Sequence, residues 1–322
     1  MNNADKIKNT EAINNMNKNY RLIHFDFVKH SRIFFIIVAA IFVTGIVSFF
    51  VRGFSLDIDF VGGTIMEINI GRDLTVADAD DITAQVEQAL GSNMVSSVVR
   101  SGTPAQQVLI KTKSLTTEQR DAVFQALAAK YNLTAKDIYA SNNVNPTVGD
   151  SLRNSAIMAV IFAAILMLLF ITFRFNFRSG LAAVLSLLFD LYVMLTFYSL
   201  FQEKMNTASI AAFLTILGYS INATIILFDR IRENIKLKKG SKFSEIVNVS
   251  IAQTFARSVN TTLTVFITLV VLYILGVPSI RNFILPLIIG VVSGLFSSVC
   301  LSGPMWSFFK GEGAETVKGK VK

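Results

Sequence analysis

Charge, cysteine and histidine are all scarce in this chain of 322 residues. Only 16% of the residues are charged, whereas 52% are hydrophobic, and the mean hydropathy is +0.53. A soluble protein of this length rarely combines so few charges with so much apolar surface. The net charge of +8 comes from cations that lie beside apolar runs, which indicates membrane topology and not nucleic-acid binding. The composition therefore predicts an integral membrane protein.

The single cysteine and the two histidines limit the chemistry that is available. Cys300 lies inside an apolar run, and one thiol forms neither an intrachain disulfide nor a zinc site. His24 and His30 precede the first apolar run, so no histidine can act as a base among the spans. An aspartyl protease needs two close carboxylates, and only Asp190 is well buried in a span. The sequence also has no P-loop. We therefore expect no enzyme activity, no cofactor and no metal site.

Six apolar stretches are long enough to cross a bilayer as helices. They lie at about 33–51, 154–173, 181–201, 207–228, 258–277 and 282–309. No small-residue cleavage site follows the first stretch, which is therefore predicted to be a retained span. The last stretch contains Pro286 and Pro304, so we expect it to be tilted, kinked or ended early.

Basic residues indicate the orientation of these spans. Cations cluster before the first span, after the second, after the fourth and after the sixth, and all four clusters are cytoplasmic if both termini are. The sequence thus predicts an α-helical membrane protein of five segments. They are a cytoplasmic N-terminal segment 1–32, a first transmembrane helix 33–52, an extracytoplasmic α+β domain 53–150, a five-helix transmembrane bundle 151–309 with a cytoplasmic loop 230–257, and a basic cytoplasmic tail 310–322.

The region after the first span has the periodicities of a small soluble domain. Thr75 and Asp78 form the outline of a capping box at the start of one helical pattern. The predicted strands lie at 54–60, 66–70, 95–100, 107–112 and 137–144, and the predicted helices at 75–90 and 116–131. The first two strand patterns flank a Gly62–Gly63 pair. Counted together as the first strand, these two patterns and the elements after them give the order β-α-β-β-α-β, which is the ferredoxin-like split arrangement.

Residues 241–257 carry apolar side chains near one face of a helix. One interpretation is a cytoplasmic amphipathic helix that lies on the membrane or against a partner. The other is an extension of the fifth span. The sequence leaves both open.

Asp190 is the clearest polar residue inside a predicted span, and an ionisable side chain there is a functional candidate because its burial is costly. A rise of 1.5 Å per residue places Asp190 about 15 Å into the third span. The fourth span carries Ser220, Asn222 and Thr224 at a similar depth. Arg257 begins the fifth span, where it can pair with a carboxylate or extend to the interface. The functional interpretation is an ion or proton relay, and the alternative is hydrogen bonding that only packs the helices.

Two motifs resemble the SecD/SecF family of protein-export membrane proteins. The first, Asp57-x-Asp59-Phe60-x-Gly62-Gly63-Thr64, is similar to the family signature D-F-x-G-G-T. The second is similar to G-Y-S-I-N-D-T followed by F-D-R-I-R-E-N. In this chain it includes Gly218, Tyr219, Ser220, Asn222, Asp229, Arg230, Arg232, Glu233 and Asn234. The length, the six spans and the single domain after the first span resemble the SecF members more than the larger SecD members.

The resemblance implies an RND-like half and an accessory role in protein export. It implies a subunit of the bacterial or archaeal cytoplasmic membrane that acts with SecD and the SecYEG channel. YajC and YidC are further candidate partners, beside the translocating preprotein and the lipid bilayer. The implied activity uses the proton gradient, or a sodium gradient in some organisms, to promote late steps of translocation, without covalent chemistry.

The chain departs from the family pattern at two positions. Ala223 stands where the resemblance implies an aspartate, and Phe189 stands where the family often has a histidine before Asp190. Our hypothesis is that Asp190, Arg257 and position 223 form the ion route. Since alanine does not titrate, we expect the route to be impaired at position 223.

Half of an RND-type exporter of lipids or small molecules is the alternative function. Such a protein would also combine six spans with extracytoplasmic domains. Here about 95 residues are used almost entirely in one small core, which leaves little room for a substrate cleft.

Overall fold

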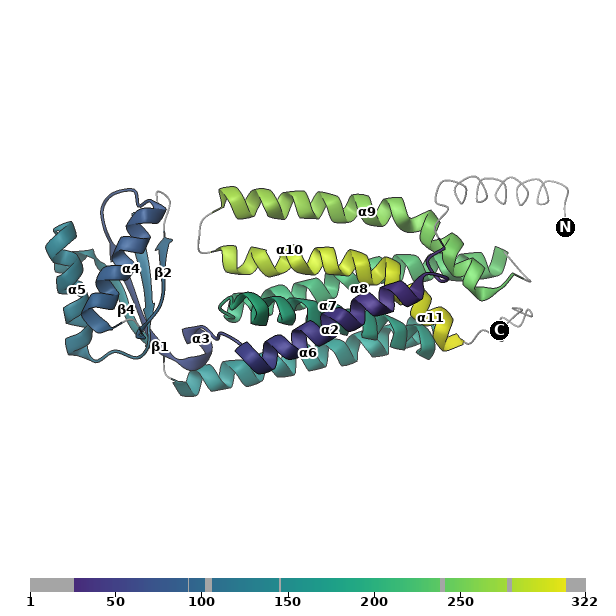
Figure 1. The fold of residues 1–322 in the computed structure, drawn as a ribbon, viewed down its shortest axis with the longest axis horizontal. Coiled ribbons are helices and arrows are strands. Elements are labelled where there is room, and N and C mark those ends of the chain that lie inside the picture. The colour runs from purple at the N-terminus through teal and green to yellow at the C-terminus, as the bar shows by residue number, and fades with distance from the viewer. Residues whose placement is uncertain are drawn as a thin grey trace.

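The structure is a computed structural model that describes residues 26–91, 93–101, 106–144, 146–237, 241–276 and 280–310. Figure 1 shows a long helical bundle with a small α+β unit, here called the sheet domain (residues 63–144), at one end. Within the described residues, six helices are long and apolar enough to cross a membrane. The predicted fold class, six spans plus a small α+β domain, is confirmed. Most of the predicted N-terminal segment and nearly all of the predicted tail lie outside the described residues.

The spans form a bundle with a buried centre and an exposed periphery. α7 (Phe177–Phe201), α8 (Thr207–Leu237) and the sixth span are the most buried. The sixth span consists of α10 (Arg281–Phe296), the π-helical segment η3 (Ser297–Ser302) and α11 (Gly303–Lys310). The peripheral spans are α2 (Ser31–Arg52), α6 (Pro146–Arg174) and α9 (Phe243–Leu275). Apolar side chains exposed on these peripheral helices are suited to contact with lipid.

The sixth span changes its helical geometry where the sequence predicts an irregularity. Pro286 is accommodated inside α10, and the π-helical turn begins at Ser297. Gly290 permits the close approach of α10 to α8, because a Cβ atom at Gly290 would lie 2.5 Å from the Cγ1 atom of Ile216. Such π-helical turns occur frequently at functional sites.

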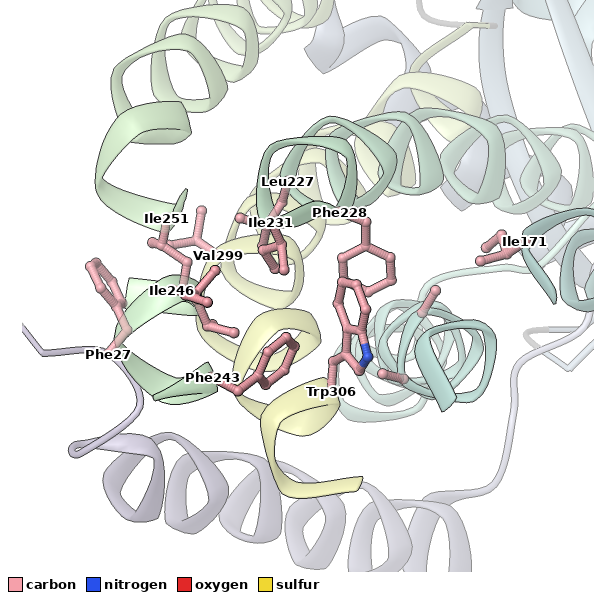
Figure 2. Close-up of a cluster of buried hydrophobic side chains, with 13 residues drawn as sticks. Phe27, Ile171, Leu227, Phe228, Ile231, Phe243, Ile246, Ile251, Val299 and Trp306 are labelled. Carbon is pink, nitrogen blue, oxygen red and sulfur yellow. The ribbon is translucent and has the colours of Figure 1, made fainter. Parts of the chain in front are cut away.

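An aromatic cluster closes the bundle at the end opposite the sheet domain. Figure 2 shows Phe228 of α8, Phe243 of α9 and Trp306 of α11 gathered there. The ring centroids of Phe228 and Trp306 are 4.8 Å apart, and those of Phe243 and Trp306 are 5.4 Å apart. Aromatic pairs at such distances add to the stabilisation that burial provides.

The packing of residues 241–257 against the bundle decides between the two interpretations of this segment. α9 continues without a break from Phe243 to Leu275, and Ile246, Val247 and Ile251 are buried against the bundle. The extension of the fifth span is confirmed, and the separate amphipathic helix is wrong. The reason is that the apolar face of this segment packs on α8 and the sixth span, which bury it more completely than a membrane surface would.

The sheet domain has the predicted β-α-β-β-α-β order. Its sheet is antiparallel with the strand order β2-β3-β1-β4. The strands are β1 (Gly63–Asn69), β2 (Val95–Ser101), β3 (Gln107–Thr112) and β4 (Ile138–Val144), and the helices are α4 (Val76–Leu90), α5 (Thr117–Tyr131) and the short 3-10 turn η1 (Ala135–Asp137). The predicted capping box of Thr75 and Asp78 is present at the start of α4. Alternate strand residues and one face of each helix form a separate core.

The strand predicted at 54–60 is wrong. Ile58–Val61 form the short helix α3, and Leu56 makes only an isolated bridge to Met205. The Asp57 side chain accepts a hydrogen bond from the backbone N–H of Ile58 and so starts the helix. Gly62, at a φ of 77°, then turns the chain into β1. Burial of alternate side chains in this segment arises from the short helix and not from a pleated strand.

The capping box predicts how the sheet domain responds to acid. Hydrogen bonds from the Thr75 side chain and backbone, and then from Arg72, lower the pKa of Asp78 from 3.8 to about 2. A carboxyl group whose pKa is lower in the folded state stabilises that state above pH 3.8, and the contribution is lost as the pH falls towards 2. We expect Asp78→Asn to reduce this acid sensitivity. Hydrogen exchange of the α4 amides in the full-length protein between these pH values measures the acid sensitivity, with α5 as the internal reference. The same pH dependence in Asp78→Asn as in the unchanged chain would contradict the prediction.

Candidate functional site

Three serine hydroxyl groups surround the carboxylate of Asp190 in the centre of the bundle. Ser220 donates to Oδ2 at 2.5 Å, Ser297 donates to the same oxygen at 2.8 Å, and Ser293 donates to Oδ1 at 2.6 Å. The four side chains, here called the Asp190 cluster, are all buried, and Asp190 has no exposed surface. The cluster joins α7, α8 and the sixth span through one carboxylate.

Close packing of small residues brings these side chains together. Ser293 and Ser297 are four residues apart, so their hydroxyl groups lie on one face of the sixth span. Gly294, on the same span, allows Ser220 to approach, since a Cβ atom there would already touch the Ser220 side chain at 3.3 Å. Sequence patterns predicted Ser220 as a member of this cluster, but not Ser293 or Ser297. The spacing of two serines four residues apart in an otherwise apolar span was the signal that would have found them.

Within the described residues, the Asp190 cluster has acceptor and donor oxygens but no compensating cation. In the part of the chain that the structure describes, no arginine, lysine or histidine forms an ion pair with Asp190. Among the same residues, no group of three or more histidine, cysteine, aspartate or glutamate side chains could hold a metal ion. Inserting an aspartate at the centre of a span costs about 3 kcal/mol. Three hydroxyl donors offset part of this cost, and binding a proton or a small cation would remove the charge.

The other predicted route residues lie outside the hydrogen-bonded cluster. Thr224 is buried one turn after Ser220, and its hydroxyl has no hydrogen-bond partner among the described residues. Ala223 is half-buried, whereas Asn222 and Arg257 are exposed. Of the predicted residues, the structure therefore brings only Ser220 into contact with Asp190.

α8 and α9 each carry an exposed asparagine within their apolar length. Asn222 lies 15 residues after Thr207, and Asn260 lies 15 residues before Leu275. Both asparagines are therefore about 22 Å from the helix ends that adjoin the sheet domain. Both side chains are exposed, and within the described residues neither carboxamide has a hydrogen-bond partner. The backbone carbonyl oxygen of Asn260 accepts a hydrogen bond from the Thr264 hydroxyl at 2.8 Å. A carboxamide exposed to lipid is costly, so we expect a polar surface of another protein next to these side chains.

The second signature motif mainly fastens α8 to the extension of α9. Arg230 donates to Gln253 at 2.6 Å, and the buried Asn234 donates to Ser250 and to Gln253, both at 2.8 Å. These bonds hold the two helices together beyond the apolar part of the bundle. Arg230 and Asn234 of the motif thus have structural partners on α9.

The remaining residues of this motif are at the surface or at its edge. Asp229 lies 3.4 Å from Arg174, and Arg230 lies 2.5 Å from Glu233. Arg232 is exposed, as is Gly218, and the half-buried Tyr219 donates to Thr262 of α9 at 3.4 Å.

The first signature motif lies where the sheet domain meets the bundle. Phe60 is buried among the bundle residues, and its carbonyl oxygen lies so close to Gly149 of α6 that a Cβ atom there would be 2.6 Å away. Gly63 begins β1, and Thr64 is buried, where it donates to Asn143 at 2.7 Å. Asp59 contacts the beginning of α8.

Comparisons with known proteins agree with this architecture. The family model "Protein export membrane protein SecD/SecF, C-terminal" matches residues 123–312. The protein translocase subunit SecF of Acidaminococcus fermentans is 40% identical over 294 residues, which is 89% of this chain and 97% of the relative. SecF of Alicyclobacillus acidocaldarius is 35% identical and covers 88% of this chain and 92% of the relative. Such extensive matches include both the sheet domain and the spans.

Longer relatives contain this unit as one part of a single chain. The protein translocase subunit SecDF of Bacillus subtilis is 36% identical over 89% of this chain, which spans 38% of that relative. The crystal structure of SecDF from Thermus thermophilus, described as a translocon-associated membrane protein, is 32% identical with a TM-score of 0.73, and the match covers 89% of this chain and 38% of that chain. The sequence and structural matches together show that this chain belongs to the SecD/SecF family of protein-export membrane proteins.

Proposed function

We propose that this chain is an accessory subunit of the Sec protein translocase that acts with SecD and uses the proton or sodium gradient to promote preprotein translocation. The observation that carries the gradient coupling is Asp190, a fully buried carboxylate that has three serine donors and no ion pair within the described residues. A carboxylate in this position gains or loses a cation at a substantial energetic cost, which an ion gradient can supply. The SecYEG channel, YajC and YidC are the proposed further partners.

The proposed contact with SecD includes the exposed carboxamides of Asn222 and Asn260. Two observations support it. Both carboxamides are exposed about 22 Å from the helix ends that adjoin the sheet domain. Relatives also exist in which one chain named SecDF contains a unit like this one together with a longer remainder. Covering both carboxamides with protein would remove the cost of exposing them to lipid.

The proposed orientation places both termini in the cytoplasm and the domain 53–150 on the opposite side. The basic residues that flank the spans support it through the positive-inside rule. In this orientation the sheet domain is on the side where a preprotein emerges.

Site-specific photocrosslinking in the native membrane tests this function. A photoreactive residue at Asn222 or Asn260 is expected to capture SecD, whereas one at Leu166, an exposed apolar residue of α6, serves as the matched control that faces lipid. Mass spectrometry of mild-detergent pull-downs should also recover SecYEG subunits. Recovery of a second RND half or an envelope adaptor, without translocon subunits, would refute the proposal and favour the small-molecule exporter.

Position 223 offers a gain-of-function prediction. Ala223 is half-buried beside the exposed Asn222, so an aspartate side chain there would be close to the proposed SecD contact. We expect Ala223→Asp to raise gradient-dependent export, because it adds the titratable group that the family pattern implies. Export of a preprotein with and without an uncoupler measures the effect, and Ala223→Asn is the neutral control. Unchanged export in a strain that relies on this subunit would contradict the prediction.

A further inference from the structure

The carboxylates of the first signature motif join three parts of the molecule. Asp57 is almost completely buried, and its Oδ2 atom lies 2.6 Å from the Nζ atom of Lys111 on β3. The same Nζ atom is 4.0 Å from Asp59. A buried ion pair that loses one partner leaves an uncompensated charge, so this pair strongly favours one arrangement of α3 against the sheet.

Asp59 reaches the end of α8 that adjoins the sheet domain. Its Oδ2 atom accepts hydrogen bonds from the backbone N–H of Thr207 at 3.1 Å and from the Thr207 hydroxyl at 2.8 Å. Thr207 is the first residue of α8, where the N–H groups lack partners within the helix and the helix dipole favours a negative charge. Asp59 therefore caps α8 from a segment almost 150 residues earlier in the chain.

Backbone hydrogen bonds complete the contact between residues 55–59 and residues 205–207, here called the joint. The N–H of Asp57 donates to the carbonyl oxygen of Met205, and the N–H of Met205 donates to that of Ser55, both at 2.9 Å. Lys204 lies beside the ion pair of Asp57 and Lys111. Burial lowers the pKa of Lys204, the nearby Asp57 raises it, and the nearby Lys111 lowers it further. The chain that precedes α8 is thus held by charge and by backbone pairing.

α8 connects this joint to the Asp190 cluster. Ser220 lies 13 residues after Thr207 on the same unbroken helix, which corresponds to about 20 Å along its axis. A displacement of one end of a rigid helix reaches its middle, where Ser220 donates to Asp190. The first signature motif and Asp190 therefore contact the same helix, α8, at Thr207 and at Ser220.

We propose that Asp57 and Asp59 are positioning residues that fix the sheet domain to the end of α8, so that the domain and Ser220 move as one body. Movement of the domain would then change the hydrogen bond between Ser220 and Asp190, and a change at Asp190 would move the domain. The expected effect of these residues on export rests on the proposed function, whereas the attachment of the sheet domain to α8 does not.

Spin-label distances in the full-length protein in bilayers test the joint directly. One label replaces Gln88 on α4 and the other replaces Leu275 at the end of α9, in a background in which Cys300 is replaced by alanine. We expect a broader distance distribution for Asp59→Ala and an unchanged one for Asp59→Asn, which keeps an acceptor oxygen for Thr207. Asp81→Ala is the matched control, because Asp81 pairs with Lys130 at 2.6 Å in the same domain but away from the joint. An unchanged distribution for Asp59→Ala would overturn the proposal.

Measurements of export test whether the Asp59 carboxylate only positions the sheet domain or takes part in export directly. We expect a several-fold loss of gradient-dependent export for Asp59→Ala and none for Asp81→Ala. Cysteines at Leu56 and Met205, which are paired across the bridge, should form a disulfide that replaces the joint and restores export to Asp59→Ala only when oxidised. The positioning role would be overturned if the disulfide formed completely and export by Asp59→Ala did not recover. It would also be overturned if Asp59→Ala broadened the distance distribution and still exported normally. Normal export by Asp190→Asn would instead refute the proposed function and leave the distance result unaffected.

Discussion

Asp190→Asn is expected to abolish the gradient-dependent part of export while the chain remains folded and inserted. Asparagine has nearly the same shape and can still bond to Ser220 and Ser293, so the packing of three spans around this position is preserved. It cannot bind or release a proton, and it provides no charge for a cation. Export of a preprotein, measured with and without an uncoupler in cells that contain this chain as their only SecF-type subunit, reports the effect.

A neighbouring serine provides the control for this substitution. Ser186 is buried one turn earlier on α7, and its hydroxyl donates to the carbonyl oxygen of Ala182 in its own helix. Ser186→Ala changes the polarity of the same buried region without touching Asp190, so gradient-dependent export should persist. If Asp190→Asn exported as well as Ser186→Ala does, the gradient would not act through this carboxylate.

Ser297→Ala is expected to reduce gradient-dependent export by about tenfold or more. Ser220 and Ser297 both donate to Oδ2, but the Ser297 hydroxyl also lies 3.3 Å from the carbonyl oxygen of Gly294. When Asp190 is protonated on Oδ2, Ser297 can accept from it and donate to Gly294, so the hydrogen bond reverses without leaving a buried group unpaired. A hydrogen bond to a charged group contributes about 1.5–3 kcal/mol, which corresponds to about a tenfold effect or more.

Ser298→Ala is the matched control for this prediction. Ser298 follows in the same π-helical segment and is equally buried, but its hydroxyl donates to the carbonyl oxygen of Leu295 and not to Asp190. We expect normal export for Ser298→Ala at equal protein levels. Equal losses in the two variants would show that the π-helical segment is sensitive to any loss of a hydroxyl group, and the assigned role of Ser297 would be refuted.

Local patterns were sufficient for most of the secondary structure. The capping box at Thr75 and the turn glycines act through neighbouring residues, and a span is recognised by its own length and hydropathy. The prediction failed at 54–60, because the Asp57 side chain and the pairing of Leu56 with Met205 decide the conformation there. Both the mistaken strand and the observed helix bury Ile58 and Phe60, so the alternation alone could not separate them.

The sequence by itself determined that this protein crosses a membrane with six helices, contains one small α+β domain and buries Asp190, because hydropathy and periodicity depend on residues close together in the chain. Only the tertiary structure decided which side chains surround that carboxylate. Ser293 and Ser297 are more than 100 residues from Asp190, and their contacts depend on how closely α10 packs against α7 and α8. The same holds for Asp59 and Thr207: a hydrogen bond between distant segments follows from the packing of helices and not from any local pattern of residues.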